Sequence, residues 1–319
     1  MRALLSCLVI LSILVPFTIS CGQVKTPDFS VHVYTRSDAC GAAETWAKYL
    51  GNYMQEDLKG TAVFGDPGLS EAVIKDSLAI GFNNIGYAYD TKTGEQLAGL
   101  CVIPIDINEN GQIDNDEDFY GRKSTIVQAI AQGRYPSPPA RDLHLVTKGK
   151  FNGITKEFVR WILIDGQKYV DEMGYIKLPT DKIDQQLNKL GQTESGIKME
   201  GVITISGAFA LYPMMVRWDE EFRKIYPNIK LDISAGGAGK GMTDALNGMV
   251  DIGMISRDIN AAEIEKGAFW ISVTKDAVVP VTNRSNPFLS NILTKGIKRQ
   301  TFVDIWITGN ISDWPSAIR

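Results

Sequence analysis

Histidine, cysteine and basic tracts are scarce in this sequence. Its 319 residues include two histidines and four cysteines, and these form no cluster with the spacing of metal ligands. There is no Gly-x-Ser-x-Gly motif, and no carboxylate pair stands out from ordinary helix-surface acids, so nucleophilic or metal-assisted catalysis has little support. The net charge is −4 without a run of Lys or Arg, which argues against nucleic acid as a partner. We therefore expect a protein that is not an enzyme.

The composition that remains is typical of a globular protein. Apolar residues make up 44% of the chain and charged residues 22%, and the length suffices for two domains. β-rich runs alternate with amphipathic helical patterns, which indicates an α/β fold. We expect short apolar runs or strands at 31–35, 62–64, 78–82, 143–146, 202–206, 230–234, 252–255 and 277–282, helices at about 44–55, 156–172, 209–226 and 241–247, and a proline-dense hinge or lobe boundary at 135–139.

The first 21 residues have the layout of an export signal. Arg2 precedes the apolar run 4–19, which is short for a transmembrane span. The small residue Ser20 followed by Cys21 is similar to a lipoprotein processing site, so Cys21 would become the lipid-modified first residue. An uncleaved anchor is the alternative. In both cases the protein would be exported, attached to the membrane, and would face the periplasm or the exterior.

The other two cysteines are Cys40 and Cys101. A disulfide between them is permitted outside the cytoplasm, but their spacing does not establish one. Two free or buried thiols explain the sequence equally well.

Three segments each follow an expected strand and precede an expected helix. They are 206–209 (Ser-Gly-Ala-Phe), 236–241 (Gly-Gly-Ala-Gly-Lys-Gly) and 36–45, which begins Arg36-Ser37-Asp38. A helix N-terminus has unpaired N–H groups and about half a positive charge, so three such ends directed at one point would bind a phosphate-like anion. Arg36 would face the anion and be held by Asp38.

Each segment alone is also explained by a tight turn, a helix cap or a surface ion pair. Residues 256–258 (Ser-Arg-Asp) follow another strand and repeat the same chemistry. Because open α/β sheets bind ligands at the carboxyl ends of their strands, the four segments together favour one shared site.

Residues 106–117 have the pattern of an EF-hand calcium loop, with Gly111 at position six and Ile113 at position eight. An acidic, solvated turn is the alternative. We expect a structural calcium ion, held by oxygen atoms of Asp106, Asn108, Asn110, Gln112, Asp114 and Glu117.

Taken together, the motifs resemble the phosphate-binding lipoproteins of ABC importers. The resemblance covers nearly the whole mature chain and is carried by segments 36–45, 80–85, 205–213, 234–240, 250–257 and 308–314. It implies a two-lobed, type II periplasmic-binding-protein fold with the ligand cleft between the lobes.

The order of the segments is unusual for this family, whose members begin with the segment that stands here at Ser206. The part expected second (31–190) comes first here, and the part expected first (196–319) comes last, so the chain resembles a circular permutant cut after Trp314. A recombined or misassembled reading frame is the alternative. The permuted order predicts continuous lobes at 31–140, with the calcium-type loop, and at 141–319. A single hinge strand near 140–146 would then let the lobes move more freely than in the usual order.

The resemblance also implies the residues that hold the anion. Cys40 and Ala42 stand where many phosphate binders have hydroxyl residues, and Asp258 is the candidate acceptor that would distinguish hydrogen phosphate from sulfate. The expected set is Ser206, Gly207, Ala208, Phe209, Gly237, Ala238, Gly239, Ser256 and Arg257 from one lobe, and Arg36, Asp38, Cys40, Gly41 and Ala42 from the other.

The function expected from these observations is capture of inorganic phosphate for an ABC permease. The alternatives are a receptor for another tetrahedral oxyanion (sulfate, molybdate or tungstate) and a sensor lipoprotein without a transport role.

Overall fold

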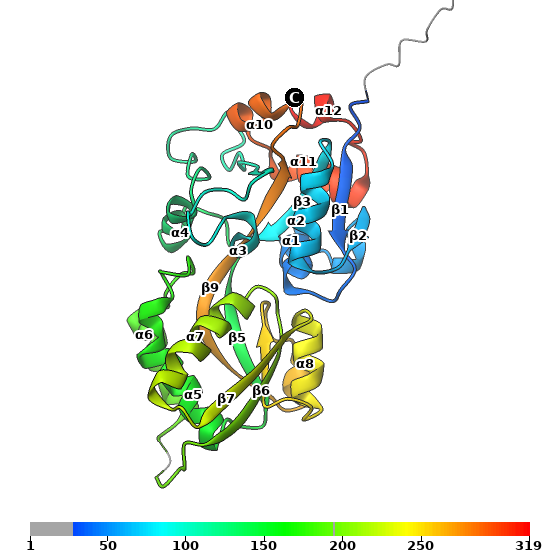
Figure 1. The fold of residues 1–319 in the computed structure, drawn as a ribbon. Coiled ribbons are helices and arrows are strands. Elements are labelled where there is room, and N and C mark those ends of the chain that lie inside the picture. Colours follow the sequence, from blue (N-terminus) through cyan, green and yellow to red (C-terminus); the bar gives the residue numbers. More distant parts are fainter. Residues whose placement is uncertain (1–27, 194) are drawn as a thin grey trace, which may run out of the picture.

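The computed structural model describes residues 28–193 and 195–319, which form two lobes joined by long strands (Figure 1). The export signal expected at residues 1–21, including Cys21, lies outside the described residues. Across the described part, every helix is too short or too polar to cross a bilayer.

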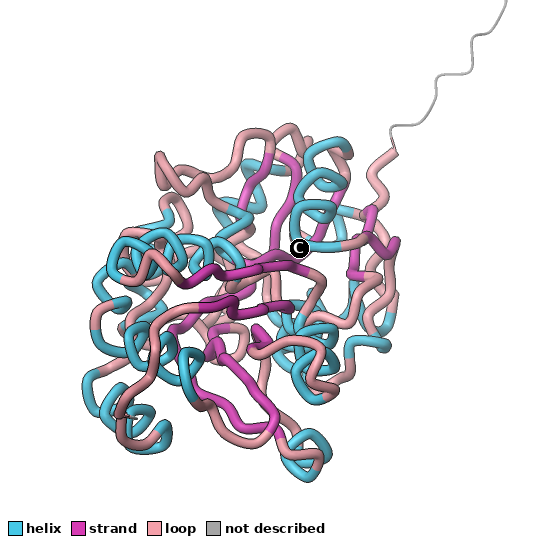
Figure 2. The backbone as a smooth tube through the Cα atoms, turned by 60° about the horizontal axis from the view of Figure 1, so that its bottom comes forward, coloured by secondary structure: helices cyan, strands magenta, loops and turns pink. Residues whose placement is uncertain are grey.

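One mixed sheet of nine strands runs through the described residues of both lobes, in the order β2-β1-β3-β9-β5-β8-β6-β7, with β4 paired to β9. Helices surround these strands (Figure 2). Within the lobes the pairs β1–β3 and β6–β8 are parallel, whereas β9 pairs antiparallel to both β3 and β5. The strands are β1 (His32–Arg36), β2 (Thr61–Val63), β3 (Ala79–Asn84), β4 (Leu100–Val102), β5 (Ala140–Lys148), β6 (Gly201–Gly207), β7 (Ile229–Ala235), β8 (Ile252–Ile255) and β9 (Ala268–Asn283).

The helices begin and end where local chemistry dictates. Cys40 caps α1, whose last residue, Gly51, is followed by Asn52 in the left-handed conformation with φ of 60°. Pro213 lies in the first turn of α7, where its fixed φ suits a helix start. The helices are α1 (Gly41–Gly51), α2 (Gly65–Lys75), α3 (Ile85–Ala88), α4 (Lys123–Ala131), α5 (Gly153–Ile164), α6 (Thr180–Leu190), α7 (Tyr212–Ile225), α8 (Ala238–Leu246), α9 (Ala261–Glu265), α10 (Leu289–Lys295), α11 (Arg299–Val303) and α12 (Trp314–Ala317).

Two separate hydrophobic cores define the lobes. In the first core the Trp46 ring lies 5.2 Å from Phe302 and 5.5 Å from Trp306. In the second, Phe222 lies 4.8 Å from Phe158. The first core draws on residues 31–140 and 277–318, which we call lobe A, and also on Ile176. The second core draws on residues between 143 and 273, which belong to lobe B (141–276).

The expected lobe boundaries are corrected by these cores. Residues 277–319 do not share a lobe with 141–276, because β9 carries the chain back from lobe B into lobe A. The single expected hinge strand is wrong for the same reason. Both β5 and β9 cross between the cores, and their ladder continues through the crossing, where Arg141 pairs with Asp276 and Ala140 with Ala277. The extra hinge freedom expected from a single strand therefore has no basis in this fold.

The two ends of the described chain lie side by side in lobe A. Val31 N donates to Ser312 O at 2.8 Å, and Trp314 N donates to Phe29 O at 2.9 Å. The indole of Trp314 is buried and donates to Leu78 O at 2.9 Å. Segments far apart in sequence thus complete the same core.

Candidate anion-binding site

Arg36, the last residue of β1, is fully buried between two carboxylates. Its Nε and Nη2 donate to the two oxygens of Asp38 at 2.8 and 2.7 Å, the pairing expected from the sequence. Its Nη1 lies 3.0 Å from Asp66 Oδ2. Burial by itself would lower the pKa of Arg36, but the carboxylates of Asp66 and Asp38 raise it above its usual value. The guanidinium is therefore charged.

Two loops of lobe B reach this arginine turn. Phe209 places its ring 5.8 Å from the guanidinium carbon of Arg36, and its carbonyl accepts a hydrogen bond from the Tyr87 hydroxyl at 3.2 Å. The glycine loop (236–241), whose residues 238–241 form the first turn of α8, lies against the same turn, where Gly239 N donates to Ala39 O at 3.0 Å. The arginine turn and the glycine loop therefore meet across the lobe interface.

Two glycines make this close approach possible. A Cβ on Gly41, at the start of α1, would overlap the carbonyl oxygen and Oγ of Ser256. Gly237 has φ of 93°, and a Cβ there would lie 2.9 Å from Ala39 O and 3.0 Å from Asp38 Oδ2. No larger residue fits either position while the lobes are in contact.

Several amides expected to bind an anion donate to carbonyl groups of the chain instead. Ala208 N donates to Met254 O at 2.8 Å, and Gly237 N donates to Gly207 O at 3.1 Å. Both bonds are internal to lobe B and fix the loops after β6 and β7. These amides therefore hold the loops of the site in place. The positive end of a helix dipole at the site comes from the first turn of α1.

Ser206 is positioned by helix α8 and does not start a helix itself. Its hydroxyl donates to Asp244 Oδ2 at 2.7 Å, and Lys240 also contacts that carboxylate. Burial opposes the ionisation of Asp244, but the hydrogen bonds from Lys240 and Ser206 lower its pKa. The expectation that segment 206–209 begins a helix is wrong, because α7 starts only at Tyr212.

Of residues 256–258, Ser256 lies at the interface between the lobes and Asp258 lies at the surface. Ser256 is buried against α1, whereas the Arg257 guanidinium binds Glu263 at 2.6 Å and Glu44 at 3.0 Å. The side chain of Asp258 is 78% exposed and pairs with Lys48 at 2.6 Å. An exposed carboxylate already paired with a lysine is unsuited to accept a proton from a buried anion, so the structure contradicts that role for Asp258.

The residues around the candidate anion site carry few hydroxyl groups. Ala42, Ala208 and Ala238 are fully buried, and Cys40 caps α1 by accepting a hydrogen bond from Ala43 N at 3.4 Å. Burial raises the pKa of the Cys40 thiol to about 12, so it is neutral. Cys40 and Cys101 are both buried and free, and no disulfide joins them.

The residues behind Arg36 were not predicted from the sequence. Asp66 lies in the first turn of α2, directly after a strand and a glycine, a strand-to-helix pattern that could have singled it out. Arg141, on β5, donates to Thr45 Oγ1 at 2.8 Å and also contacts Gly41 O and Asn84 Oδ1. These partners lie 57 to 100 positions away in sequence, so no local pattern could reveal them.

Loop 106–117 folds around its own side chains. Asp106 Oδ2 accepts from Gly111 N at 2.8 Å, and Glu117 Oε1 accepts from Ile107 N and Asn108 N at 3.0 and 2.9 Å. The described residues contain no group of three or more His, Cys, Asp or Glu side chains placed to hold a metal ion.

Comparison with known proteins gives concordant matches. Residues 184–318 match the family described as the PBP superfamily domain. The phosphate-binding protein PstS 2 of Streptococcus agalactiae is 30% identical over 244 residues, which cover 76% of this chain and 69% of the relative. The phosphate-binding protein PstS of Bacillus subtilis is 31% identical over 118 residues, or 37% of each chain.

Among solved structures, a phosphate-binding protein of a phosphate ABC transporter from Streptococcus pneumoniae has the same fold. The match has a TM-score of 0.57 at 19% identity and covers 90% of this chain and 99% of that chain. Two α/β lobes whose loops meet over a buried arginine define a type II periplasmic solute-binding protein. The identity and coverage of the S. agalactiae relative identify the family within this class: the chain belongs to the phosphate-binding protein family of ABC importers.

Proposed function

We propose that this protein captures inorganic phosphate outside the cytoplasm and delivers it to an ABC permease. The observation that carries the proposal is a buried, charged Arg36 at the junction of the two lobes, in a chain of the phosphate-binding family. In a site without water, a guanidinium binds a tetrahedral oxyanion through charge-assisted hydrogen bonds. The first turn of α1, with Gly41 and Ala42, contributes its N-terminal dipole from the same lobe.

Capture would proceed by separation and closure of the lobes. The contacts that opening must break include the hydrogen bonds from Gly239 N to Ala39 O and from the Tyr87 hydroxyl to Phe209 O, and the ion pairs of Glu44 with Arg257 and Lys48 with Asp258. An anion that binds both lobes stabilises the closed arrangement, which the permease would then recognise.

Calorimetric titration of the chain with phosphate, sulfate, arsenate, molybdate and tungstate tests this function. We expect phosphate to bind most tightly. Arg36→Ala should weaken binding by about 30-fold or more, because truncating one partner of a buried charge pair costs about 2–5 kcal/mol. Arg36→Lys retains the charge but loses the planar fork, and should cause a smaller loss. The exposed Arg284→Ala should bind phosphate like the wild type.

Wild-type phosphate affinity in both Arg36 variants would remove Arg36 from the site. Tighter binding of another oxyanion would reassign the ligand within the same cleft. Because Cys40 and Ala42 supply no hydroxyl groups to the site, comparing the affinities of these ions is the decisive test of selectivity.

We also propose that the chain is a circular permutant of its family's usual order. The supporting observation is the proximity of its described ends, with Ser30 bridged to Asp313 in an antiparallel pair. Sequencing of the intact native protein by mass spectrometry would separate this from a misassembled reading frame.

We propose a structural calcium ion in loop 106–117. The oxygens of Asp106, Asn108 and Asn110 already turn inward to accept amide hydrogens, a donor set that suits a hard cation. Calcium should raise the thermal midpoint of the wild type and leave that of Glu117→Gln nearly unchanged. An equal response of both proteins to calcium and to chelator would contradict the proposal.

The lipid anchor is the remaining proposal from the sequence. Cys21 would carry the lipid, and Cys21→Ser should release the protein from membranes in fractionation experiments. Retention of the serine variant would favour the uncleaved anchor instead.

A further inference from the structure

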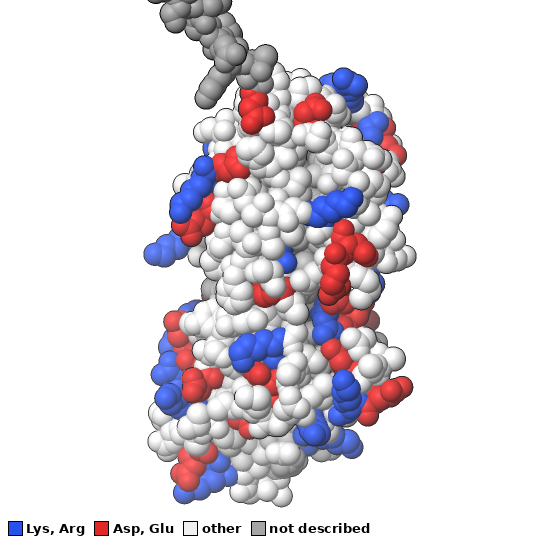
Figure 3. Space-filling view, turned by 90° about the vertical axis from the view of Figure 1, so that its right-hand side faces the viewer, with Lys and Arg blue, Asp and Glu red and all other residues white. Residues whose placement is uncertain are grey.

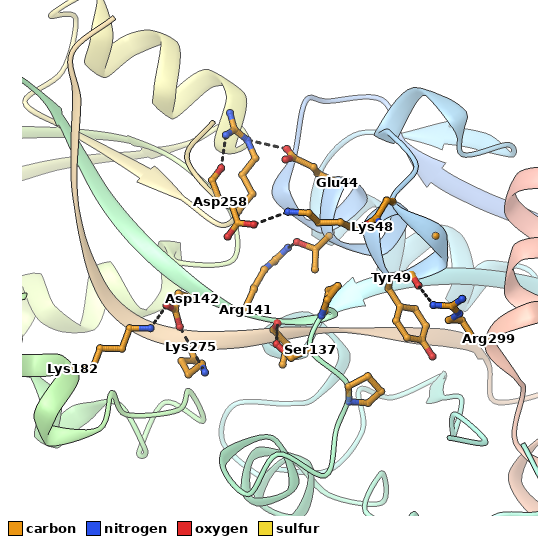
Figure 4. Close-up of a pocket in the computed structure, with 17 residues that line it drawn as sticks. Glu44, Lys48, Tyr49, Ser137, Arg141, Asp142, Lys182, Asp258, Lys275 and Arg299 are labelled. Carbon is orange, nitrogen blue, oxygen red and sulfur yellow. Dashed lines mark hydrogen bonds and ion pairs between the residues drawn. The ribbon is translucent and has the colours of Figure 1, made fainter. Parts of the chain in front are cut away.

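A pocket of about 610 Å³ lies between the lobes beside the hinge strands. Its walls come from α1 and α11 of lobe A, α6 and the loop after β8 of lobe B, and the crossing strands β5 and β9 (Figure 4). Pockets of this size accommodate ligands much larger than a single tetrahedral oxyanion.

The lining of this pocket is strongly basic. Six Lys or Arg residues and three Asp or Glu residues line it, a net charge of +3 in a chain whose net charge is −4. On the face shown in Figure 3, by contrast, acidic and basic side chains are interspersed. A concave basic surface with low-dielectric walls concentrates anions.

Two of these cations are not neutralised by a carboxylate of their own. The Arg299 guanidinium contacts Tyr49 O at 3.5 Å and forms no ion pair with any described residue. Lys275 lies 3.8 Å from Asp142, but the same carboxylate makes its close contact with Lys182. Arg299 and Lys275 therefore have charge available for a ligand.

Arg141 supplies a buried group at the same pocket. Its side chain is 7% exposed, and its Nε is fully buried without a hydrogen-bond partner among the described residues. An unsatisfied buried N–H of a charged group is costly, and the guanidinium adds a positive charge to the pocket wall. The same guanidinium binds the start of α1 through Thr45 and Gly41, which connects the pocket to the candidate anion site.

We propose that this pocket is a second binding site, distinct from the Arg36 site, for a small polyanion with two or more negatively charged groups. Arg299 belongs to lobe A, whereas Lys275 and Lys182 lie on the lobe B side, so one ligand with charges at both ends would connect the lobes. A single tetrahedral ion is too small to satisfy both walls. A condensed phosphate and an organic polycarboxylate share the required chemistry.

Calorimetry with tripolyphosphate, citrate and orthophosphate tests the proposal on the wild-type chain. We expect tripolyphosphate, citrate or both to bind. The one that binds more tightly shows whether the ligand is a condensed phosphate or an organic polycarboxylate. Arg299→Gln and Lys275→Gln should each weaken that binding about tenfold, since each removes one charge-assisted contact. Lys298→Gln is the matched control, because Lys298 adjoins Arg299 but donates to Glu109 O outside the pocket lining.

A second variant separates the two sites. Arg36→Lys should weaken orthophosphate binding and leave the polyanion affinity within about twofold. The proposal is overturned if neither polyanion binds, if Lys298→Gln weakens binding as much as Arg299→Gln, or if Arg36→Lys abolishes polyanion binding while Arg299→Gln does not. The last result would place the polyanion in the Arg36 site and leave the proposed phosphate function standing.

Discussion

Arg36 is held in one orientation because Asp38 and Asp66 occupy its two sides. A flexible cation would have to be ordered when an anion binds, whereas this one is ordered beforehand. The cost is two buried carboxylates beside an anion site, and the single positive charge of Arg36 offsets one of them.

Gly41 provides a test of closure at the level of one residue. In Gly41→Ala the new methyl group would overlap Ser256, so the lobes could not approach fully. We expect phosphate affinity to fall about tenfold or more and the radius of gyration with phosphate to exceed that of the wild type. Gly68→Ala, in α2 with open space around its Cβ, is the control and should behave like the wild type. Unchanged compactness in Gly41→Ala would contradict the interface described here.

Asp276 predicts a pH dependence. Burial raises its pKa to about 7 from an ordinary value of 3.8, although Arg141, Lys123 and the Ala277 amide oppose the shift. Between pH 4 and 7 the folded state therefore holds a proton that the unfolded state lacks. The contribution of Asp276 to stability falls as pH rises through this range, by at most about 1.4 kcal/mol per unit.

Asp276→Asn should remove this slope. Urea unfolding at pH 5, 6, 7 and 8 should show the wild type losing stability relative to Asp276→Asn as pH rises to 7, with no further relative loss above that. The exposed Asp232→Asn should run parallel to the wild type. Parallel curves for Asp276→Asn as well would mean that the carboxyl ionises normally.

Single residues were predictable from sequence where their partners are local. Arg36 and Asp38 are two positions apart and directly follow a strand, so their pairing could be inferred. Asp258 seemed to belong to the same chemistry, but the backbone turns it towards solvent and Lys48, and no sequence pattern reports that turn.

At the scale of elements, the glycine loop (236–241), whose last four residues begin α8, serves packing as well as the site. A Cβ on Gly241 would lie 2.7 Å from Gly207 Cα and 2.9 Å from Met254 O. Helix α8 can therefore approach β6 and β8 only because these positions lack side chains. The sequence alone allowed this loop to be either a structural turn or part of the anion site, and the close contacts of Gly241 support the structural role.

Gly241→Ala measures that packing. We expect it to destabilise lobe B by about 1–3 kcal/mol, since overpacking forces the helix from the sheet. Differential calorimetry on this variant and on Gly68→Ala, which has open space around the same substitution, gives the comparison. Equal midpoints would show that α8 can shift at no cost.

The bounds of β8, which is an uninterrupted apolar run, were predicted correctly, whereas those of β9, which contains charged residues, were not. β8 was expected at residues 252–255 and is found there because all four of its residues are buried. β9 was expected only at 277–282, because Lys275 and Asp276 interrupt its apolar run. The expected lobe division came instead from the permuted segment order, and it did not foresee that β9 returns the chain from lobe B to lobe A.

For the whole molecule, two crossing strands rather than one join the lobes, and both ends of the described chain complete lobe A. The proposed circular permutation would therefore give the same arrangement of cores as the family's usual segment order. The resemblance alone suggested the reordering, and composition or periodicity could not have done so.

A chain whose present ends are joined, and which is opened elsewhere, tests whether the two segment orders give the same fold. Linking Arg319 to Asp28 through a short flexible linker, with new ends opened between Gly191 and Gly201, restores the usual order. We expect the same thermal stability within a few degrees and the same phosphate affinity within about threefold, because exposed loops tolerate such cuts. Failure of soluble, folded protein to form would count against the permutation, provided that the linker alone, added at the C-terminus, is harmless.

A crystal structure of the protein grown with phosphate shows where the ion binds. If the two lobes close over one phosphate ion at Arg36, tetrahedral density lies between the Arg36 guanidinium and the first turn of α1, within hydrogen-bonding distance of lobe B. Density elsewhere and none beside Arg36, in crystals of protein that calorimetry shows to be saturated with phosphate, would rule out this site.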